Sequence, residues 1–401
     1  MKSFTAFVTV VAFLGLGRVE AEIIRVPRDY PTIQAAMDVA SEHDIVLVEP
    51  GTYTENILMK SGVTLKSEAG AANTTIDGAG AGSVIDCIGV SDRTTIRGFT
   101  IRNGTGTLAF NGRYGGGIRC WNNASPTIED NVFIGNAATF GGAVGCRYGS
   151  APMIRHNIFE ANTAQLEGGG IYAIDAVGRT ITIESNNLRL NVAKAGGAIW
   201  VGAIDVVIRQ NVVAENRADR IGGLRAAGGV WAGFAGTKMI SRNLIIGNVC
   251  PDLGGGMWVN DGTTTIENNT FFGNASPLGG GIATGGLGQK TIRANILAGS
   301  KQGAGIHCTA SGPTQLACND LWGNAGGDDL PECLSDGGDN LTADPLFCDV
   351  AAGDFSLQGG SPCLPGGAFP HCQLIGAVGP GRCHLLVVKP ETWSGVKTMF
   401  R

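Results

Sequence analysis

The chain has 401 residues and a formal net charge of −5, and 64 of its residues are glycine. The acidic balance argues against a nucleic acid or an anionic membrane surface as a partner. Glycine at about twice its usual share of roughly 7% excludes a mainly helical protein, because interior glycine destabilises helices.

The first 21 residues are predicted to be a secretion signal. Lys2 supplies a positive start, residues 4–16 form an apolar core, and Val19-Glu20-Ala21 forms a small-residue cleavage site. The apolar stretch is too short to span a bilayer comfortably, and nothing later approaches the length of a membrane-spanning segment. We therefore expect cleavage near Ala21, no transmembrane segment, and a mature chain that is secreted or held at the cell surface.

A short helix is expected at residues 31–40, where Ile33, Ala36, Met37 and Ala40 share one face. A buried strand is expected to follow at residues 44–48. Because stacked strands expose their edges and core at an open end, we expect the helix to plug the first coil of the repeats that follow.

From about residue 95 to 325 one phrase recurs, in which a β-branched run is followed by Asn-x-aliphatic-x-x-Asn and then by a glycine-rich step. Its period of 24 to 32 residues indicates stacked units. The β-branched runs are too short for ordinary helices, which favours an all-β right-handed parallel β-helix with coils about 4.8 Å apart. We expect this β-helix, with its N-terminal cap, to span residues 22–325.

The first asparagine of each phrase is expected to stack into a hydrogen-bonded ladder at a turn. This ladder would contain Asn131, Asn157, Asn186, Asn211, Asn243, Asn269, Asn295 and Asn319. Its role is predicted to be structural.

Alignment of the glycine-rich steps gives a uniformly apolar column that must face the core. It consists of Ile118, Val144, Ile171, Ile199, Val230, Met257, Ile282 and Ile306. Since side chains alternate along a strand, the next residue in each coil faces outward. That outward column is Arg119, Gly145, Tyr172, Trp200, Trp231, Trp258, Ala283 and His307.

Four consecutive coils thus place an aromatic ring at the same position: Tyr172, Trp200, Trp231 and Trp258. An exposed strip of this kind would stack against the apolar faces of an extended polysaccharide. The alternative is that the rings stack on one another, or lie under the glycine-rich loops, and only stabilise neighbouring coils.

Three carboxylates near this column, Asp175, Asp205 and Asp261, are the candidate catalytic residues. They would hydrogen-bond sugar hydroxyls or act as a general acid and base. The alternative is that each is a solvated turn aspartate.

A second outward column alternates in charge: Arg97, Glu129, Arg155, Glu184, Arg209, Ser241, Glu267 and Arg293. We interpret it as a structural ion-pair ladder. Cys120 and Cys146 follow their core aliphatics by two residues, so both should point inward on adjacent coils, as an axial disulfide or as two stacked buried thiols.

Seven of the 11 cysteines lie in the last quarter of the chain. In a secreted protein this predicts a disulfide-stapled region, which we place at residues 326–386 as a C-terminal cap. Residues 387–401 would form a tail. No metal site or cofactor is predicted; calcium is conceivable among outward carboxylates, but no repeated Asp-rich loop supports it.

The segment Tyr30-Pro-Thr-Ile-Gln-Ala-Ala36, followed by Val48-Glu-Pro-Gly-Thr-Tyr-Thr-Glu-Asn56, resembles the opening of the pectin-lyase-like β-helix superfamily. The ending Asp344-Pro-Leu-Phe347 with Ser361-Pro-Cys363 resembles secreted bacterial members. The resemblance covers most of the mature chain and implies the fold. It implies activity only weakly, because the superfamily holds lyases, hydrolases, esterases and adhesins.

Catalytic signatures of that superfamily are missing. There is no Gly-His-Gly, Arg25-Val-Pro-Arg28 lacks the Arg-x-Pro-x-x-Arg spacing, and Gly51-Thr-Tyr-Thr-Glu55 occurs without the later esterase motifs. Three hypotheses follow: a polysaccharide-binding solenoid, a polysaccharide lyase or glycoside hydrolase, and a surface or adhesion scaffold. The sequence leaves open whether the protein is an enzyme, and the first hypothesis is preferred.

Overall fold

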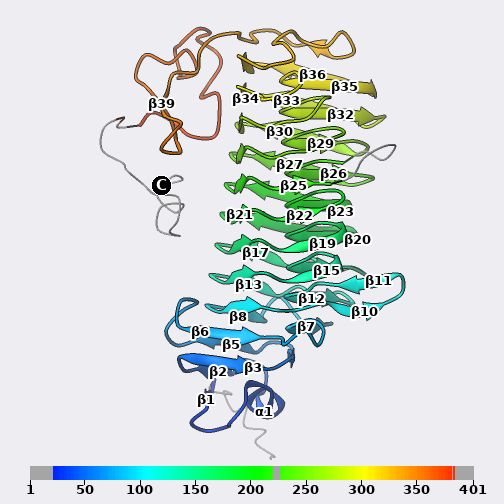
Figure 1. The fold of residues 1–401 in the computed structure, drawn as a ribbon, viewed down its shortest axis with the longest axis vertical. Coiled ribbons are helices and arrows are strands. Elements are labelled where there is room, and N and C mark those ends of the chain that lie inside the picture. The colour runs from blue at the N-terminus through cyan, green and yellow to red at the C-terminus, as the bar shows by residue number, and fades with distance from the viewer. Residues whose placement is uncertain (1–20, 220–225, 382, 384–401) are drawn as a thin grey trace, which may run out of the picture.

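The computed structural model describes residues 21–219, 226–381 and 383. Their strands stack coil upon coil into one long parallel β-helix, with β1 (Ile23–Val26) at one end (Figure 1). The predicted signal peptide, apart from its last residue, and the predicted tail at residues 387–401 lie outside the described residues.

Most coils contribute two successive strands to sheet A. The corresponding strands of successive coils pair into two columns, which we call the first and second strand columns, and the long strands β20 and β23 belong to both. The first column contains β4 (Ile57–Leu58), β7 (Ile85–Ile88), β12 (Ile118–Trp121), β16 (Val144–Cys146), β20 (Ile171–Glu184), β23 (Ile199–Arg209), β26 (Val230–Gly233), β29 (Met257–Val259), β32 (Ile282–Gly286) and β35 (Ile306–Ser311). The second adds β1 (Ile23–Val26), β2 (Ile45–Val48), β5 (Thr64–Ser67), β8 (Thr95–Arg97), β13 (Thr127–Glu129), β17 (Met153–Arg155), β27 (Thr237–Ser241), β30 (Thr263–Glu267), β33 (Lys290–Arg293), β36 (Thr314–Ala317) and β38 (Ser335–Asp336).

Sheet B has eleven strands and closes the other side of the main core. It contains β3 (Gly51–Thr54), β6 (Thr74–Asp77), β9 (Thr100–Arg102), β14 (Val132–Ile134), β18 (Ile158–Glu160), β21 (Asn187–Arg189), β24 (Val212–Ala214), β28 (Leu244–Ile246), β31 (Thr270–Phe272), β34 (Ile296–Ala298) and β37 (Asp320–Trp322). Sheet C contains β10 (Thr107–Ala109), β11 (Gly112–Tyr114), β15 (Ala137–Phe140), β19 (Thr163–Glu167), β22 (Val192–Ala193) and β25 (Arg217–Ala218). Two hairpins are antiparallel, β10–β11 and β39 (Phe347–Asp349) with β40 (Asp354–Leu357).

The helix α1 (Ile33–Val39) closes the N-terminal end, as predicted, and buries Ile33, Ala36 and Met37. Its first turn is satisfied by Glu55, whose carboxylate accepts hydrogen bonds from the backbone N–H groups of Ile33 and Gln34, both at 2.9 Å. A carboxylate at this position also favours the helix dipole. Glu55, which belongs to the esterase-like Gly-x-Tyr-x-Glu, thus has a structural contact here.

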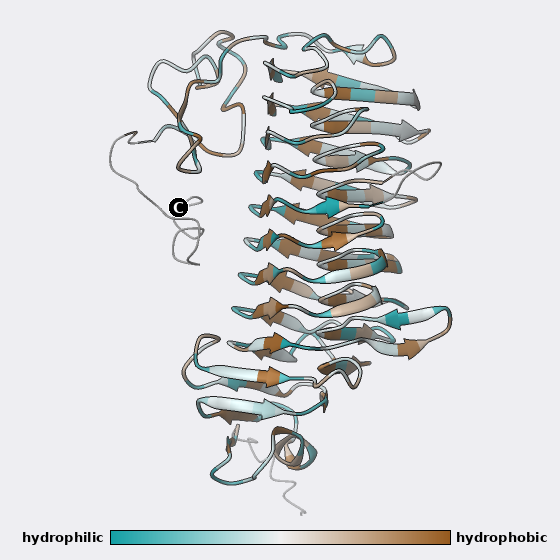
Figure 2. Cartoon of the chain, in the orientation of Figure 1, coloured by the Kyte–Doolittle hydropathy of each residue, from teal (hydrophilic) through white to brown (hydrophobic). Residues whose placement is uncertain are grey.

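The aliphatic column forms the main core. All eight residues from Ile118 to Ile306 are buried and pair in register along the first column of sheet A. Apolar residues recur in strand after strand along the stack (Figure 2). The predicted alignment of the coils is confirmed.

The asparagine ladder is confirmed, and its bonds explain the spacing of the phrase. Asn157 accepts from the backbone N–H and the side-chain amide of Asn131 at 3.0 and 3.1 Å. It donates to the carbonyl of Ile128 at 2.8 Å and to Asn186 Oδ1 at 3.1 Å. The second asparagine of each phrase follows the strand of sheet B that the first asparagine precedes, so a second ladder runs along the other ends of these strands. It contains Asn136, Asn162, Asn191, Asn216, Asn248 and Asn274.

The alternating charges pair as an ion-pair ladder on the outer face of sheet A. Glu129 lies between Arg97 and Arg155, at 3.4 and 2.7 Å. Glu184 pairs with Arg209 and Glu267 with Arg293, both at 2.5 Å. Because these pairs are partly exposed, each contributes about 0.2–1 kcal/mol, and their main effect is on register.

Cys120 and Cys146 are stacked buried thiols, the second of the two predicted forms, and Cys87 adds a third thiol in register. Burial and hydrogen bonding to Cys120 raise the pKa of both outer thiols. Cys250 and Cys363 are also buried and free. Three disulfides, Cys308–Cys333, Cys318–Cys372 and Cys348–Cys383, staple the C-terminal region.

The Cys-rich region has two parts. Residues 326–341 close the last coil: β38 pairs with β36, and Leu330 and Leu334 pack on the main core. Residues 342–381, which we call the buttress, continue back along the outer face of sheet B (Figure 1). There the backbone N–H of Ala377 donates to Thr270 Oγ1 at 3.0 Å, and Asn268 Nδ2 donates to the carbonyl of Leu374 at 2.5 Å.

Among the described residues, no helix has the length and apolar character needed to cross a bilayer.

Candidate functional site

The aromatic column has the alignment that the sequence predicts. Tyr172, Trp200, Trp231 and Trp258 occupy the same register position in four consecutive coils. The ring centroids of Tyr172 and Trp200 are 4.9 Å apart, and those of Trp200 and Trp231 are 4.5 Å apart with ring planes 5° from parallel. The rings therefore stack on one another at about the spacing of the coils.

The column faces away from the main core, but it is not exposed, and the expectation of an open aromatic strip is wrong. The exposed fractions are 3% for Tyr172, 3% for Trp200, 5% for Trp231 and 0% for Trp258. Burial also raises the pKa of the Tyr172 phenol. As the structure stands, these rings offer no face to a polysaccharide.

Sheet C covers the aromatic column. The rings form a second hydrophobic core with Phe140, Ala195 and Ala218, which belong to or follow the strands of sheet C, and with Cys250 and Leu253 higher in the stack. The outward face of the first column of sheet A is thus the floor of this second core. Of the alternative reading, the stacking of the rings on one another is confirmed, whereas their cover is sheet C rather than the glycine-rich loops.

The glycine-rich step lets the chain turn back sharply from sheet C into sheet A. Gly141 has φ +68°, and a Cβ there would lie 2.2 Å from the carbonyl oxygen of Val144. Gly168 repeats this geometry one coil later, with φ +67°. Only glycine tolerates both the left-handed conformation and the close backbone.

The three candidate carboxylates each accept a hydrogen bond from a neighbouring coil, with Asp175 lying within β20, Asp205 within β23 and Asp261 in the turn after β29. Asp175 accepts from Arg147 Nε at 3.0 Å, Asp205 from the backbone N–H of Thr237 at 2.7 Å, and Asp261 from that of Leu287 at 2.9 Å. In the strand register Asp205 lies opposite Thr180 rather than Asp175. These contacts favour a structural role in joining the coils, and the assignment of the three aspartates to catalysis stays a prediction.

At the N-terminal end of the second core, the β10–β11 hairpin projects from the stack (Figure 1). Phe110 at the hairpin tip is 79% exposed and Leu108 is 69% exposed. The Phe110 ring lies 6.3 Å from Trp121 and 5.5 Å from the half-buried Tyr148. We call the surface formed by Leu108, Phe110, Trp121 and Tyr148 the hairpin platform.

Two arginines border the hairpin platform. Arg119 donates to both carboxylate oxygens of Asp86, at 2.5 and 2.8 Å, and its guanidinium lies 5.3 Å from the Trp121 ring centroid. Arg147 lies 5.1 Å from the Tyr148 ring centroid and donates to the Tyr114 hydroxyl at 2.6 Å. Cation–π contacts of this kind fix the guanidinium groups beside the rings.

Sequence reasoning missed the hairpin platform because Phe110 lies in an insertion outside the repeat alignment, and Trp121 follows the aligned column rather than belonging to it. Two signals were available. Leu108 and Phe110 are bulky apolar residues beside Asn111-Gly112, a pair typical of a tight turn, and the interval before Asn131 departs from the repeated phrase.

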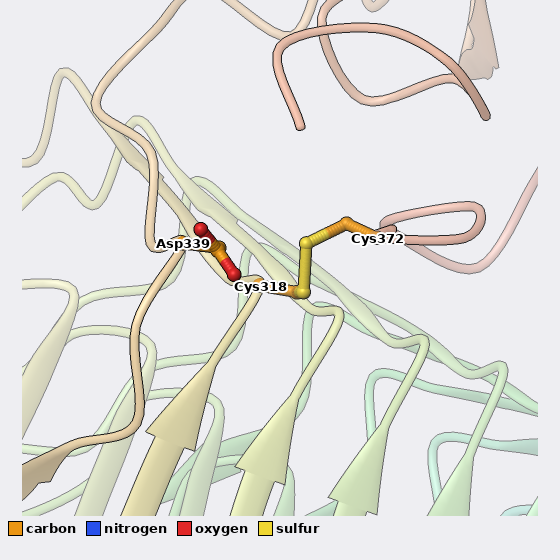
Figure 3. Close-up of side chains that lie close together, drawn as sticks. All are labelled: Cys318, Asp339 and Cys372. Carbon is orange, nitrogen blue, oxygen red and sulfur yellow. A yellow bond between two sulfur atoms is a disulfide. The ribbon is translucent and has the colours of Figure 1, made fainter. Parts of the chain in front are cut away.

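Within the described residues, one group of three side chains has the spacing of metal ligands: Cys318, Asp339 and Cys372. Figure 3 shows that the two sulfur atoms are joined to each other. Asp339 pairs with His371. Since thiolates bind metals and a disulfide does not, this group is a covalent clasp between the last coil and the buttress.

Two solved structures are similar to this chain in outline. One is the PL6 family alginate lyase AlyGC, at 13% identity and a TM-score of 0.36, with 84% of this chain and 55% of that chain covered. The other is the Azotobacter vinelandii mannuronan C-5 epimerase AlgE6 A-module, at 14% identity and a TM-score of 0.33, with 78% and 94% covered. The chain thus spans about half the length of the lyase.

No curated protein matches the sequence. A family model does: residues 54–213 and 191–321 match the right-handed β-helix region, and together they cover well over half of the chain. The parallel stack, the single capping helix among the described residues and the in-register ladders agree with this match. The chain belongs to the right-handed β-helix family.

Proposed function

We propose that this protein binds extended polysaccharide, and that it does so at the hairpin platform rather than along the buried column. The observation that carries the proposal is the 79% exposure of Phe110 on a hairpin that projects from the stack. Exposed rings backed by other rings suit the apolar face of a sugar.

The polar groups around the hairpin platform suit the same ligand. The guanidinium of Arg147 is held between Tyr114, Tyr148 and Asp175, and Asn111 accepts from the Tyr114 hydroxyl at 2.6 Å. Burial raises the pKa of the Tyr114 phenol, so this hydroxyl stays protonated at neutral pH. Rings for stacking and fixed polar groups for hydroxyls are the usual means of sugar recognition.

A scaffold role is the second candidate, and the closed aromatic column favours it. Four large rings, two asparagine ladders and an ion-pair ladder all stabilise the stacking of coils. A lyase or hydrolase is the third candidate here, and the contacts of the candidate carboxylates Asp175, Asp205 and Asp261 with neighbouring coils do not require it.

Secretion is part of the proposal. The three disulfides support an oxidising compartment, and residues 1–21 have the composition of a cleaved signal. The readout is the N-terminal sequence of the exported protein, which we expect to begin near Glu22.

The test of function is a polysaccharide panel that includes alginate, pectin and neutral glycans, incubated with the purified mature protein. Affinity electrophoresis reports binding, and chromatography of the same incubations reports shortened products. We expect retardation by at least one polysaccharide without shortened chains. Shortened chains would establish an enzyme, and no retardation across the panel would favour the scaffold.

A further inference from the structure

An opening lies between sheet B and the buttress, several coils away from the hairpin platform (Figure 1). It is a groove of about 330 Å³. Sheet B and its turns supply Phe272, Ala298, Gly299, Trp322 and Gly323, and the buttress supplies Asp344, Pro345, Leu346, Phe347, Val350 and Gln358. We call it the aromatic notch.

The coil register explains why a notch exists. Phe272, Ala298 and Trp322 occupy the same outward position in three consecutive strands of sheet B. The small Ala298 leaves a gap between two aromatic residues whose backbones are two coils, or about 9.6 Å, apart. Gly299 extends the floor, because a Cβ there would lie 3.2 Å from the Phe272 ring.

The buttress adds a third ring at right angles. The centroids of Phe272 and Phe347 are 5.8 Å apart and their planes meet at 89°. Phe355 packs beneath both, at 5.3 and 5.4 Å, and fixes their positions. Rings from two segments far apart in sequence therefore form a rigid corner.

Trp322 is 40% exposed, whereas Trp121, Trp200, Trp231 and Trp258 are at most 8% exposed. The chain thus buries its other described tryptophans and leaves this one at the mouth of the notch.

The charge of the lining is negative. Asp344 is its one ionisable side chain, and no lysine or arginine lines the groove. Asp344 Oδ1 accepts from the backbone N–H of Leu346 at 2.9 Å, which fixes the carboxylate in place. The amide of Gln358 is already engaged, since its Nε2 donates to the carbonyl of Phe347 at 2.9 Å.

Aromatic faces beside a single carboxylate attract a cation that does not require many hydrogen bonds. We propose that the aromatic notch binds a small organic cation with a quaternary ammonium group. Its methyl groups pack against Trp322, Phe272 and Phe347, and its charge faces Asp344. A primary ammonium would lose its hydration here without enough acceptors, and a sugar would find few free polar partners.

The proposal is independent of polysaccharide binding. It is tested by titrating the purified protein with choline chloride at constant ionic strength, with tryptophan fluorescence and calorimetry as readouts. The matched control ligand is 3,3-dimethyl-1-butanol, which has the same shape without the charge, and methyl glucoside reports sugar binding. We expect saturable binding of choline alone.

Four variants locate the site. Trp322→Ala should abolish the fluorescence change, and Asp344→Asn, which keeps an acceptor for Leu346, should weaken choline binding about tenfold. Phe110→Ala, on the hairpin platform, should bind choline as the wild type does. Trp322→Phe keeps a ring and the fold, and should retain binding.

The proposal is overturned if choline gives no saturable signal, if the neutral analogue binds equally well, or if methyl glucoside displaces choline. Unchanged affinity in Asp344→Asn, with an unchanged thermal midpoint, would also overturn it.

Discussion

Replacement of Asn211 by alanine tests whether the asparagine ladders hold the coils together. Asn211 is fully buried. It accepts from the backbone and the side chain of Asn186 at 2.9 and 3.0 Å, and donates to the carbonyl of Ile183 at 2.8 Å and to Asn243 Oδ1 at 3.0 Å. Asn243 keeps a donor after the change, from the backbone N–H of residue 211.

Alanine at this position orphans two donors of Asn186 and one acceptor of Ile183. An unsatisfied buried polar group costs about 1–3 kcal/mol, so loss of partners for these three groups should lower the free energy of unfolding by about 3–9 kcal/mol. The assay is guanidinium unfolding with the disulfides intact. The matched control is Asn73→Ala, at an exposed asparagine with one hydrogen bond to Ala69, which should change the free energy by less than about 0.5 kcal/mol.

The variant Asn211→Asp tests the direction in which stability changes with pH. An ionised carboxylate would face two acceptors, the carbonyl of Ile183 and Asn243 Oδ1, so the folded state should raise the pKa of the new aspartate. The folded protein would then lose stability as pH rises above the unfolded pKa of about 3.9. We expect this variant to be closer to the wild type at pH 4 than at pH 7. A loss in Asn211→Ala no larger than in Asn73→Ala would refute the reasoning.

Three further predictions concern the two cores and the buttress. Trp200→Ala should lower the free energy of unfolding by about 3–5 kcal/mol, because the Trp200 ring is buried against Tyr172 and Trp231. Guanidinium unfolding measures this loss. An unchanged free energy of unfolding would show that sheet C does not close this core. Burial raises the pKa of Asp320 from 3.8 to about 6, despite a hydrogen bond from the Cys363 thiol. The folded state therefore holds this proton more tightly, so the contribution of Asp320 to stability should be greatest below about pH 4 and fall as pH rises through 6, by about 3 kcal/mol at most. Thermal midpoints should show a flatter pH profile for Asp320→Asn, and an unchanged profile would contradict the assignment. Thiol titration should find no reactive cysteine in the native protein and five after denaturation, and a count of three would indicate an axial disulfide in the stack formed by Cys87, Cys120 and Cys146.

The repeats allowed the stack to be predicted because each period contributes the same local pattern. The Asn phrase and the aliphatic column fix which residues face inward, and the pairing of Ile118 with Val144 and of Tyr172 with Trp200 follows from that alignment. The alternating column from Arg97 to Arg293 was predictable for the same reason.

Exposure of the aromatic column could not be predicted from side-chain alternation, because alternation tells only which face of a strand a residue occupies. Whether that face is exposed to solvent depends on a further strand of the coil, the one that joins sheet C. The sequence signal for it is weak, since Ala138, Phe140 and Ala195 lie in short stretches without a shared motif. The hairpin platform and the aromatic notch arise where the repeat is interrupted or where the buttress returns, so period-based reasoning does not reach them.

The most direct test of polysaccharide binding at the hairpin platform is the dissociation constant of the best ligand from the panel for three proteins. The wild type is compared with Phe110→Ala and with Leu287→Ala, a control at another loop tip that is 85% exposed. Loss of an exposed stacking ring should weaken binding about tenfold in Phe110→Ala and leave Leu287→Ala unchanged. Equal affinities in all three proteins would contradict the placement of the site.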